Sequence, residues 1–354
     1  MKKSRLLSVL LCLALLSGLL ATFASAADSG SAILDEMDVN AKAAVLVDPD
    51  TGEILYEKNA HAHNYPASIT KVMTCLLTLE AVDRGELSLE QTVTASSALH
   101  TGIGEGASTA DIKEGEQIRI IDLLYAALIP SANEACNVMA EAVSGDVASF
   151  VELMNTRAAE LGMEDTHFSN THGYHDDDHY TSAYDIYLMC REAMKHETFR
   201  TIVGSKNYTM PATNLHPEPR IIRSTNALIS NFRVAGYIYE YATGIKTGST
   251  SDAGHCLISS AQEGELHFVS VVMGAERIEE NGVGNLLNFS ETSHLFDYGF
   301  KNFAYRTILE DKEIIQEVPV SLSKTDYVTV HPANNVESLF PRDLDPAELD
   351  RVIS

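Results

Sequence analysis

The sequence predicts a mixed α/β fold of the α+β kind, in which one antiparallel sheet with flanking helices is assembled from both ends of the chain around a helical insertion. Three observations support this prediction. Residues 42–57 have a hairpin pattern, the middle of the chain has helical patterns, and residues 244–273 read as a strand meander followed by a helix. With 354 residues, 45% of them hydrophobic, the chain can bury one large core or two smaller ones.

Turn residues and apolar spacing define the first elements. Apolar residues at 43–47 and the returning segment 53–56 flank a turn sequence, Asp-Pro-Asp-Thr-Gly, at 48–52, which predicts two antiparallel strands. Between residues 68 and 84, apolar side chains cover most of the circumference of a predicted helix. Such a helix is expected to be buried in the centre of a domain.

The later elements follow from periodicity and from residues that end helices. They are helices at 120–129, 133–145, 149–161 and 182–196, strands at 244–247, 254–262 and 266–273, and a helix at 285–298. Pro130 ends the first of these helices and Gly145 ends the second. After residue 302, segments 317–322 and 327–330 alternate like strands of a separate small β unit, which has too few residues for a comfortable core of its own.

The first 26 residues have the pattern of a secretory signal peptide. Lys2, Lys3 and Arg5 precede an apolar run at 6–23, and Ala-Ser-Ala at 24–26 supplies the small residues that a signal peptidase reads. A membrane anchor is the alternative, but polar and small residues interrupt the run and no stop-transfer charges follow. We therefore expect cleavage near Ala26 and an exported, extracytoplasmic mature protein with no later membrane span and no membrane anchor.

Charge and cysteine content exclude several classes of function. The net charge of −25 argues against nucleic acid as a partner and against docking on anionic lipid through a basic patch. Four cysteines remain after signal cleavage, widely separated and each in or beside an apolar run: Cys75, Cys136, Cys190 and Cys256. This spacing predicts buried, unpaired thiols rather than a disulfide framework.

Three short motifs carry candidate chemistry. They are S-x-x-K at Ser68 to Lys71, S-x-N at Ser131 to Asn133, and K-T-G at residues 246–248. Each motif alone occurs often by chance. The three motifs together indicate an active site, because each lies on the kind of element that its role requires. The same set of motifs is typical of penicillin-binding proteins and class A β-lactamases.

The first motif has the residues of an activated nucleophile. Ser68 precedes the buried helix, so its hydroxyl should lie at the positive end of the helix dipole. Lys71 is three residues further on and therefore on the same helix face. A lysine that is desolvated near other cations can lose its proton near neutral pH and then accept the serine proton.

The other two motifs supply binding groups. Ser131 follows a helix-ending proline in a loop from which its hydroxyl can point into a cleft, and Asn133 offers the donor and acceptor that suit a peptide amide. Lys246 lies on a strand that can pair with an extended peptide, and its ammonium can hold a terminal carboxylate. We expect Gly248 to let substrate approach this strand closely.

With these motifs, residues 38–302 resemble the low-molecular-mass penicillin-binding proteins, the serine-type D-alanyl-D-alanine carboxypeptidase family. The resemblance extends to residues 65–74, 131–135, 154–155, 161–163, 166, 168, 170–173, 179–185, 225–226, 244–248 and 253–257. The sequence departs from the family at Glu134, where Asp is commoner, and at Ser249, which follows K-T-G. After residue 302 the resemblance predicts an incomplete or shortened second domain without the family's final amphipathic membrane helix.

The resemblance implies a β-lactamase/DD-peptidase-like fold and an acyl-enzyme mechanism without metal or other cofactor. In the family's mechanism Ser68 would attack the penultimate D-Ala carbonyl of a peptidoglycan stem peptide, and Lys71 would take its proton. Ser131, helped by Lys246, would relay a proton to the leaving D-Ala. β-Lactams would acylate Ser68 and leave slowly.

The resemblance also assigns the substrate-binding residues and the domain boundaries. Asn133 would hold the peptide, Lys246, Thr247, Gly248 and Ser249 would bind it along the strand, and the backbone N–H groups of Ser68 and Ser249 would form the oxyanion hole. The implied organisation is a signal peptide at 1–26, a serine DD-peptidase domain at 27–302, and an incomplete or shortened β-rich domain at 303–354.

Several alternatives compete with this interpretation. Residues 172–179 hold three histidines and three aspartates, but without a helical H-x-x-x-H pair they favour a solvated acidic turn over a metal site. A class A β-lactamase needs an E-x-x-L-N segment, and Glu152 to Asn155 is one residue too short and better explained as helix. A penicillin sensor, or a structural homologue with slow turnover, remains open. His61 and His63 are expected at the surface.

Overall fold

The computed structural model describes residues 37–280, 283–322 and 324–345. The predicted signal peptide at 1–26 lies outside these residues. Among the helices in the described ranges, none combines the length and apolar character needed to cross a bilayer.

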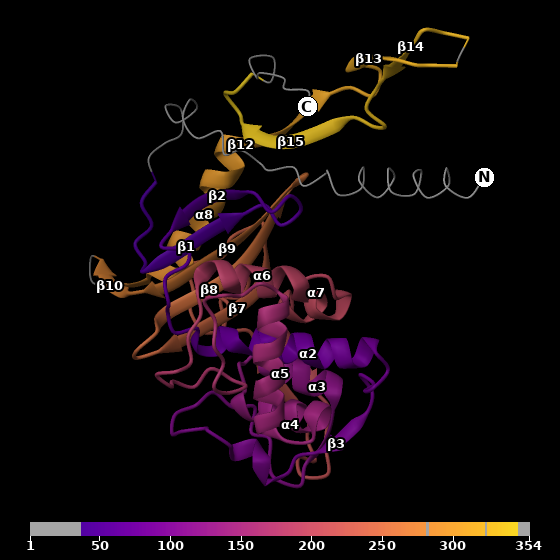
Figure 1. The fold of residues 1–354 in the computed structure, drawn as a ribbon. Coiled ribbons are helices and arrows are strands. Elements are labelled where there is room, and N and C mark those ends of the chain that lie inside the picture. Colours follow the sequence, from indigo (N-terminus) through magenta and orange to yellow (C-terminus); the bar gives the residue numbers. More distant parts are fainter. Residues whose placement is uncertain (1–36, 281–282, 323, 346–354) are drawn as a thin grey trace, which may run out of the picture. The chain divides into compact units, whose positions relative to one another are not determined.

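A five-stranded antiparallel sheet in the order β2-β1-β9-β8-β7 organises the molecule (Figure 1). Its strands are β1 (Ala43–Val47), β2 (Ile54–Lys58), β7 (Ala242–Thr250), β8 (Gly254–Glu263) and β9 (Leu266–Ala275). Val45 pairs with Glu57 of the hairpin on one side and with Val271 of β9 on the other. The prediction that both ends of the chain build one sheet is confirmed.

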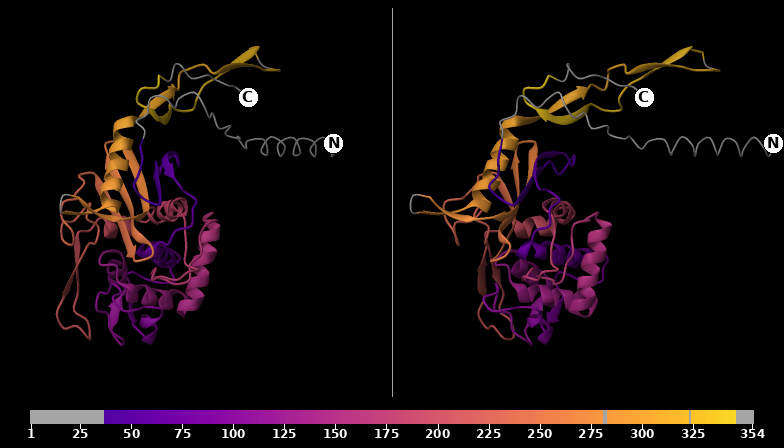
Figure 2. Two further views of the ribbon diagram at one scale, coloured as in Figure 1. Left: turned by 90° about the vertical axis from the view of Figure 1, so that its left-hand side faces the viewer. Right: turned by 60° about the vertical axis from the view of Figure 1, so that its left-hand side comes forward.

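Side chains along each strand alternate between the two faces of this sheet, and different helices pack on each face. Val45, Val269 and Val271 belong to the main core beneath the helical region. On the other face, α8 (Leu287–Asn302) packs so closely that a Cβ at Gly299 would meet Phe268 and Leu46. Figure 2 shows α8 along one face of the sheet and the remaining helices beyond the other. Because both faces are covered, β1, β8 and β9 are buried over most of their length.

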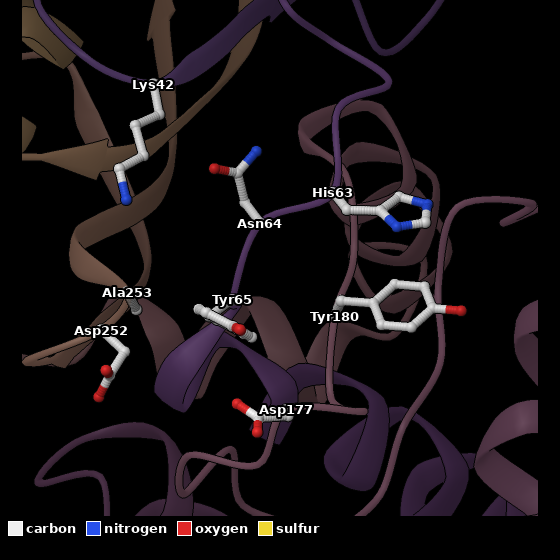
Figure 3. A pocket seen from close by; sticks show the side chains of 8 residues that line it. All are labelled: Lys42, His63, Asn64, Tyr65, Asp177, Tyr180, Asp252 and Ala253. Carbon is white, nitrogen blue, oxygen red and sulfur yellow. The ribbon is translucent and has the colours of Figure 1, made fainter.

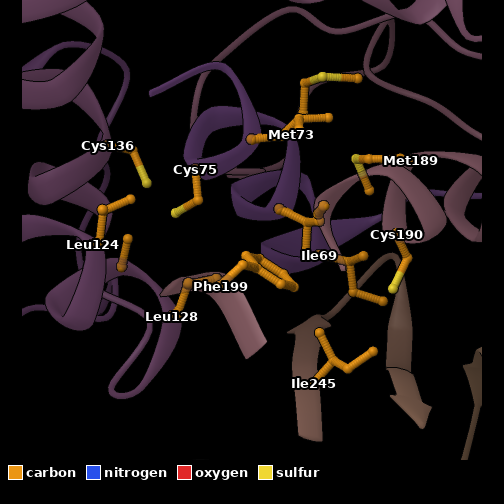
Figure 4. Close-up of a cluster of buried hydrophobic side chains, with 14 of the residues drawn as sticks. Ile69, Met73, Cys75, Leu124, Leu128, Cys136, Met189, Cys190, Phe199 and Ile245 are labelled. Carbon is orange, nitrogen blue, oxygen red and sulfur yellow. The ribbon is translucent and has the colours of Figure 1, made fainter. Parts of the chain in front are cut away.

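Helix α2 (Lys71–Asp83) lies at the centre of the helical region, and ten of its 13 residues are buried. It packs against α3 (Ile120–Leu128), α4 (Asn133–Ser144), α5 (Val147–Glu160) and α6 (Ala183–Ala193). Figure 4 shows the apolar cluster on this side, in which Met73 and Cys75 of α2 lie among side chains from the other helices and Ile245 of β7. The buried helix predicted from the apolar pattern is therefore confirmed.

Several short elements escaped prediction. They are the 3₁₀ turns η1 (Ala67–Thr70) and η2 (Ser97–His100), helix α7 (Glu197–Val203), and the pairs β3 (Thr92–Thr94) with β4 (Gln117–Arg119), β5 (Asn207–Met210) with β6 (Arg220–Arg223), and β10 (Arg277–Glu280) with β11 (Val283–Leu286). Helix α8 also runs four residues beyond its predicted end and stops where β12 begins. The strands among these elements have only three or four residues, too few to show a periodic pattern.

The chain after α8 forms two further strand pairs. Strand β12 (Phe303–Leu309) pairs with β15 (Val336–Pro341), and β13 (Gln316–Pro319) pairs with the exposed β14 (Tyr327–Val330). The Tyr305 hydroxyl donates a hydrogen bond of 2.7 Å to buried Asp48 at the end of β1. This contact ties β12 to the central sheet.

All four cysteines in the described residues are buried and free, as predicted. Burial raises the pKa of the Cys136 thiol to about 12 and that of Cys256 to about 11. These thiols are therefore protonated at neutral pH and behave as small apolar core residues.

Candidate active site

The candidate nucleophile, Ser68, lies in the 3₁₀ turn η1, which leads directly into α2. Ala67 has a φ of 48°, in the left-handed region, so the chain turns sharply just before the serine. Gly173 packs against this turn, where a Cβ would come within 1.8 Å of the Ala67 carbonyl oxygen. The sequence predicted a position before a buried helix, and the structure adds a separate tight turn that fixes it.

Lys71 is the partner of this serine. Its Nζ donates to Ser68 Oγ at 2.8 Å and to the His172 carbonyl oxygen at 2.6 Å. The side chain is fully buried, and burial lowers the pKa of Lys71 from 10.5 to about 8. A large share of the lysine is therefore neutral in mildly alkaline solution, and its nitrogen can then accept the serine proton.

Ser131 and Lys246 form a second pair of the same kind. Lys246 Nζ donates to Ser131 Oγ at 3.0 Å and to the carbonyl oxygen of Thr247 at 2.8 Å. Burial, with a further contribution from the charge of Lys71, holds the pKa of Lys246 well below its usual value. Ser131 has a φ of 71°, a conformation that directs the loop after α3 towards Lys246.

Asn133 is the first residue of α4 and is almost fully buried. Its backbone N–H donates to the Ser108 carbonyl oxygen at 2.9 Å, which fixes its position. Its side-chain Oδ1 accepts no hydrogen bond from any part of the chain that the structure describes. A buried acceptor without a donor is costly, so this oxygen is suited to the N–H of a bound peptide.

Gly248 has a structural role that the sequence did not predict. A Cβ at Gly248 would lie 2.8 Å from the Pro66 carbonyl oxygen and 3.2 Å from the backbone nitrogen of Ser68. The glycine therefore lets β7 approach the nucleophile segment, residues 65–71, and its role in the approach of substrate stays a prediction. This close approach brings Ser249 beside Ser68 at the edge strand of the sheet.

A cleft of about 380 Å³ opens beside these groups. Ser68, Asn133 and Ser249 line it, whereas Lys71 and Lys246 are buried. Lys71 contacts the cleft-lining Ser68, and Lys246 contacts Ser131, which is itself buried behind the cleft wall. The edge of β7 beside the cleft carries no strand in the sheet order, so an extended peptide can pair with it. Thr247 completes the strand edge with a hydrogen bond of 2.6 Å between its hydroxyl and that of Thr225.

The loop at residues 105–108 forms another wall of the cleft and was not predicted. Glu134 holds it from below, because its Oε1 accepts from the backbone N–H of Ala110 at 2.8 Å and from the Thr109 hydroxyl at 2.7 Å. In the sequence, Glu134 stood out only because Asp is commoner after S-x-N in the family, and nothing there indicated that it binds this loop.

Ser249 also contacts a residue that sequence reasoning missed. Its hydroxyl lies 3.2 Å from Nδ1 of His255, the residue opposite it on β8. Burial lowers the pKa of His255, so its imidazole is largely neutral at pH 7 and can accept the serine hydrogen. The sequence prediction ended the strand at residue 247, and only the observed pairing of β7 with β8 places Ser249 opposite His255.

The histidine-rich segment at 172–179 is only partly a solvated turn. Asp176 to Asp178 are exposed, but His172 and His179 are buried. His179 Nε2 lies 2.8 Å from the Thr70 hydroxyl, and its Nδ1 accepts from the backbone N–H of Ser169. The acidic part of the segment is a solvated turn as predicted, whereas the His179 ring braces Thr70 beside the nucleophile and the His172 ring lies 3.2 Å from the Thr101 carbonyl oxygen. Burial lowers the pKa of His172 to about 4 and that of His179 to about 3.

The remaining candidate segments have ordinary structural roles. Glu152 and Asn155 lie within α5, and Asn155 uses its amide to bind the Phe168 backbone. His61 and His63 are exposed beside Asp165. In the ranges that the structure covers, no group of three potential metal ligands comes together.

Comparisons with known proteins agree with this geometry. A family profile for peptidase S11, described as D-alanyl-D-alanine carboxypeptidase, matches residues 29–277. The D-alanyl-D-alanine carboxypeptidase DacF of Bacillus subtilis is 31% identical over 319 residues, which are 90% of this chain and 77% of that protein. The D-alanyl-D-alanine carboxypeptidase DacA of Escherichia coli is 29% identical over 342 residues, 93% of this chain and 79% of the relative.

Solved structures give the same result. Penicillin-binding protein 5 of Haemophilus influenzae superposes with a TM-score of 0.73 at 26% identity, covering 88% of this chain and 85% of that one. A peptidoglycan synthesis regulatory factor, PBP3, of Streptococcus pneumoniae also gives 0.73, at 27% identity and 87% coverage of each chain. The antiparallel sheet with flanking helices predicted from the sequence is thus the fold of these proteins.

Proposed function

The chain belongs to the peptidase S11 family of D-alanyl-D-alanine carboxypeptidases, and from this membership we propose that Ser68 is the nucleophile with which it removes the terminal D-Ala of peptidoglycan stem pentapeptides. The enzyme is a serine-type D-alanyl-D-alanine carboxypeptidase. The observation that carries the residue assignment is the buried pairing of Lys71 Nζ with Ser68 Oγ at 2.8 Å. A serine hydroxyl becomes a good nucleophile only when a base in hydrogen-bond reach can take its proton.

Acylation proceeds in one addition and one elimination. Ser68 Oγ bonds to the carbonyl carbon of the penultimate D-Ala while its proton passes to Lys71 Nζ. The backbone N–H groups of Ser68 and Ser249 stabilise the resulting oxyanion, a contribution worth about 3 kcal/mol per donor in comparable sites. The carbon–nitrogen bond then breaks, and Ser131 gives its hydroxyl proton to the nitrogen of the departing D-Ala and takes one back from Lys246.

Deacylation uses the same groups in the reverse sense. Before this step the proton that Lys71 took from Ser68 passes to Lys246, which restores both lysines. Water then adds to the ester carbonyl and gives a proton to Lys71, and Lys71 returns that proton to Ser68 Oγ as the ester bond breaks. β-Lactams enter by the same attack on their ring amide, but their leaving nitrogen stays attached to the acyl group. The acyl-enzyme therefore persists, which accounts for inhibition by these compounds.

Substrate binding follows the edge of β7. The terminal carboxylate of the pentapeptide lies towards Lys246 and the hydroxyl of Thr247, and the peptide backbone pairs with the strand around Ser249. Asn133 Oδ1 accepts from a peptide N–H, since this buried oxygen has no donor in the described structure. Gly248 supports binding indirectly, by letting the strand reach the nucleophile segment.

Peptidoglycan lies outside the cytoplasmic membrane, so we also propose export with removal of residues 1–26. In this organisation residues 27–302 form the DD-peptidase domain and residues 303–354 a β-rich C-terminal segment. N-terminal sequencing of the exported protein is expected to begin near Ala27, and an intact Met1 in that protein would contradict the proposal.

The decisive experiment measures D-alanine release from a muramyl pentapeptide ending in D-Ala-D-Ala, with a Ser68→Ala variant as control. We expect release by the unmodified chain and none by the variant. Penicillin bound to Ser68 without any release would instead indicate a sensor or a slow structural homologue. Release that persists in Ser68→Ala would overturn the assignment of the nucleophile.

A further inference from the structure

A second cavity, of about 290 Å³, lies next to the catalytic cleft (Figure 3). Asp252, in the turn between β7 and β8, lines both cavities and so marks where they meet. The second cavity is bounded by Lys42 just before β1, by Tyr65 just before the nucleophile segment, and by Asp177. It is therefore formed by the same segments that position the active site.

Charges of both signs face this cavity. The stem of Lys42 runs across Gly274, where a Cβ would lie 2.6 Å from Lys42 Cδ, and Figure 3 shows its ammonium directed into the cavity on the side of Asp252. Within the described part of the chain, neither Lys42 nor Asp252 forms an ion pair, and Asp177 pairs only with the half-buried His175 at 3.5 Å. One ammonium and two carboxylates thus face the space, and Asp252 has a hydrogen bond of 2.8 Å from the Ser251 hydroxyl but no cationic partner in the described residues.

The path of the substrate leads towards this cavity. Lys246 holds the terminal carboxylate, Ser68 attacks at the next carbonyl, and the peptide then continues along β7 past Ser249 towards residues 250–252. The residue that precedes the acylated D-Ala is the diamino acid of the stem peptide, only about 3.5 Å further along an extended chain. Its side chain emerges at the end of the cleft that Asp252 shares with the second cavity.

We propose that this cavity binds the side chain of the third residue of the stem peptide and selects one that ends in both an ammonium and a carboxylate, as a diamino dicarboxylic acid does. The ammonium lies between Asp177 and Asp252, the carboxylate pairs with Lys42, and the methylene groups cover the ring of Tyr65. This proposal rests on the proposed function, because it needs the peptide to lie along β7.

The test compares three pentapeptides that end in D-Ala-D-Ala and differ only in the third residue: diaminopimelate, lysine and Nε-acetyl-lysine. Exposed ion pairs contribute up to about 1 kcal/mol, which corresponds to about fivefold. We expect kcat/KM to fall up to about fivefold at each step of this series. Because the charges are exposed, both ratios should shrink as ionic strength rises.

Two sets of variants test the Lys42 ammonium and the Asp177 and Asp252 carboxylates separately. Lys42→Gln should abolish the preference for diaminopimelate over lysine and keep the preference for lysine over its acetylated form. Asp177→Asn combined with Asp252→Asn should abolish the second preference. Lys113→Gln and Glu164→Gln alter exposed residues that line neither cavity, and they should change neither ratio.

A binding measurement distinguishes failure of this proposal from failure of the proposed function. The three peptides are titrated calorimetrically into the Ser68→Ala variant, which does not require turnover, and the same order of Kd is expected. Equal kcat/KM and equal Kd for the three peptides would overturn the cavity assignment while leaving the carboxypeptidase reaction intact. No release from any peptide, with the Kd order preserved, would overturn the proposed reaction and support the cavity.

Discussion

Lys71 and Lys246 are two buried ammonium groups within one active site, each bonded to a serine hydroxyl. Removing a charge from water is unfavourable, so burial lowers the pKa of both residues, and the charge of Lys71 lowers that of Lys246 further. The neutral form of a lysine is thereby populated at a pH where an exposed lysine would be fully charged. In the proposed mechanism, the same burial that costs stability creates the base that takes the proton of Ser68.

This residue-scale argument predicts the pH dependence of acylation. Below the pKa of Lys71 its nitrogen holds a proton and cannot accept another, and above that pKa it is free to do so. The rate constant for acylation by a fluorescent penicillin should therefore rise about tenfold per pH unit below pH 8 and level off above it. Stopped-flow measurements between pH 6 and pH 10 provide the check.

A Lys71→Arg variant is the control for this prediction, because arginine stays protonated throughout that range. It should acylate slowly and show no rise with pH. A flat profile for the unmodified enzyme, at its full rate down to pH 6, would exclude Lys71 as the base.

At the scale of elements, the site depends on three segments whose backbones approach unusually closely. Gly248 of β7 and Gly173 of the histidine-rich segment both lie against the turn that carries Ser68. Side chains at either position would collide with backbone atoms, which cannot move aside as a flexible side chain does. Glycine at these two positions therefore sets the distance between the nucleophile and its surroundings.

Helix α4 holds the loop at 105–112 through Glu134, and this predicts an effect on substrate binding. Glu134→Gln removes the charge from two strong hydrogen bonds, of which each charge-assisted bond contributes about 1.5–3 kcal/mol. The loosened wall should lower kcat/KM for D-Ala release about tenfold, mainly through KM. Steady-state kinetics on the pentapeptide measure the effect.

Glu141→Gln is a matched control for that variant, since Glu141 lies on the same helix and also accepts from a hydroxyl, that of Ser96. It should leave kcat/KM within twofold of the unmodified enzyme. An equal loss in both variants would mean that the helix, rather than the loop, had been disturbed.

Strongly periodic elements were predictable, and contacts between distant segments were not. The apolar circumference of α2, the early hairpin and the strands around K-T-G are local patterns, and all were confirmed with small shifts of their ends. The pairing of Ser68 with Lys71 also follows from local spacing. The burial of His172 and His179, and the close approach of Gly248 to the segment before Ser68, arise from packing between segments about one hundred or more residues apart, which no local pattern reveals.

At the scale of the whole molecule, the central sheet is held together by contacts between the two ends of the described chain. Strand β1 pairs with β9, α8 covers both strands, and Tyr305 of β12 bonds to Asp48 beside β1. Asp48 is fully buried and also accepts from the backbone N–H of Asp50. The strands after α8 thus contribute to the stability of the sheet that carries the site.

Tyr305→Phe tests this contribution. The variant leaves Asp48 Oδ2 without the hydroxyl donor, and a buried group that loses its partner costs about 1–3 kcal/mol. The free energy of unfolding in urea should fall by that amount, while penicillin still acylates Ser68 at the normal rate. Tyr327→Phe, at an exposed tyrosine of β14, should leave the free energy of unfolding unchanged, and an unaltered value for Tyr305→Phe would contradict the argument.

The pairing of Val45 with Val271 has a consequence for how the enzyme folds. Strand β1 cannot pair with β9 until most of the chain has been synthesised. Pairing between segments so far apart in the sequence makes folding slow. Ser68 comes early in the chain and Lys246 late, so the helical region can form before the active site exists. Penicillin labelling would then report the final step of refolding, after helical circular dichroism has already recovered.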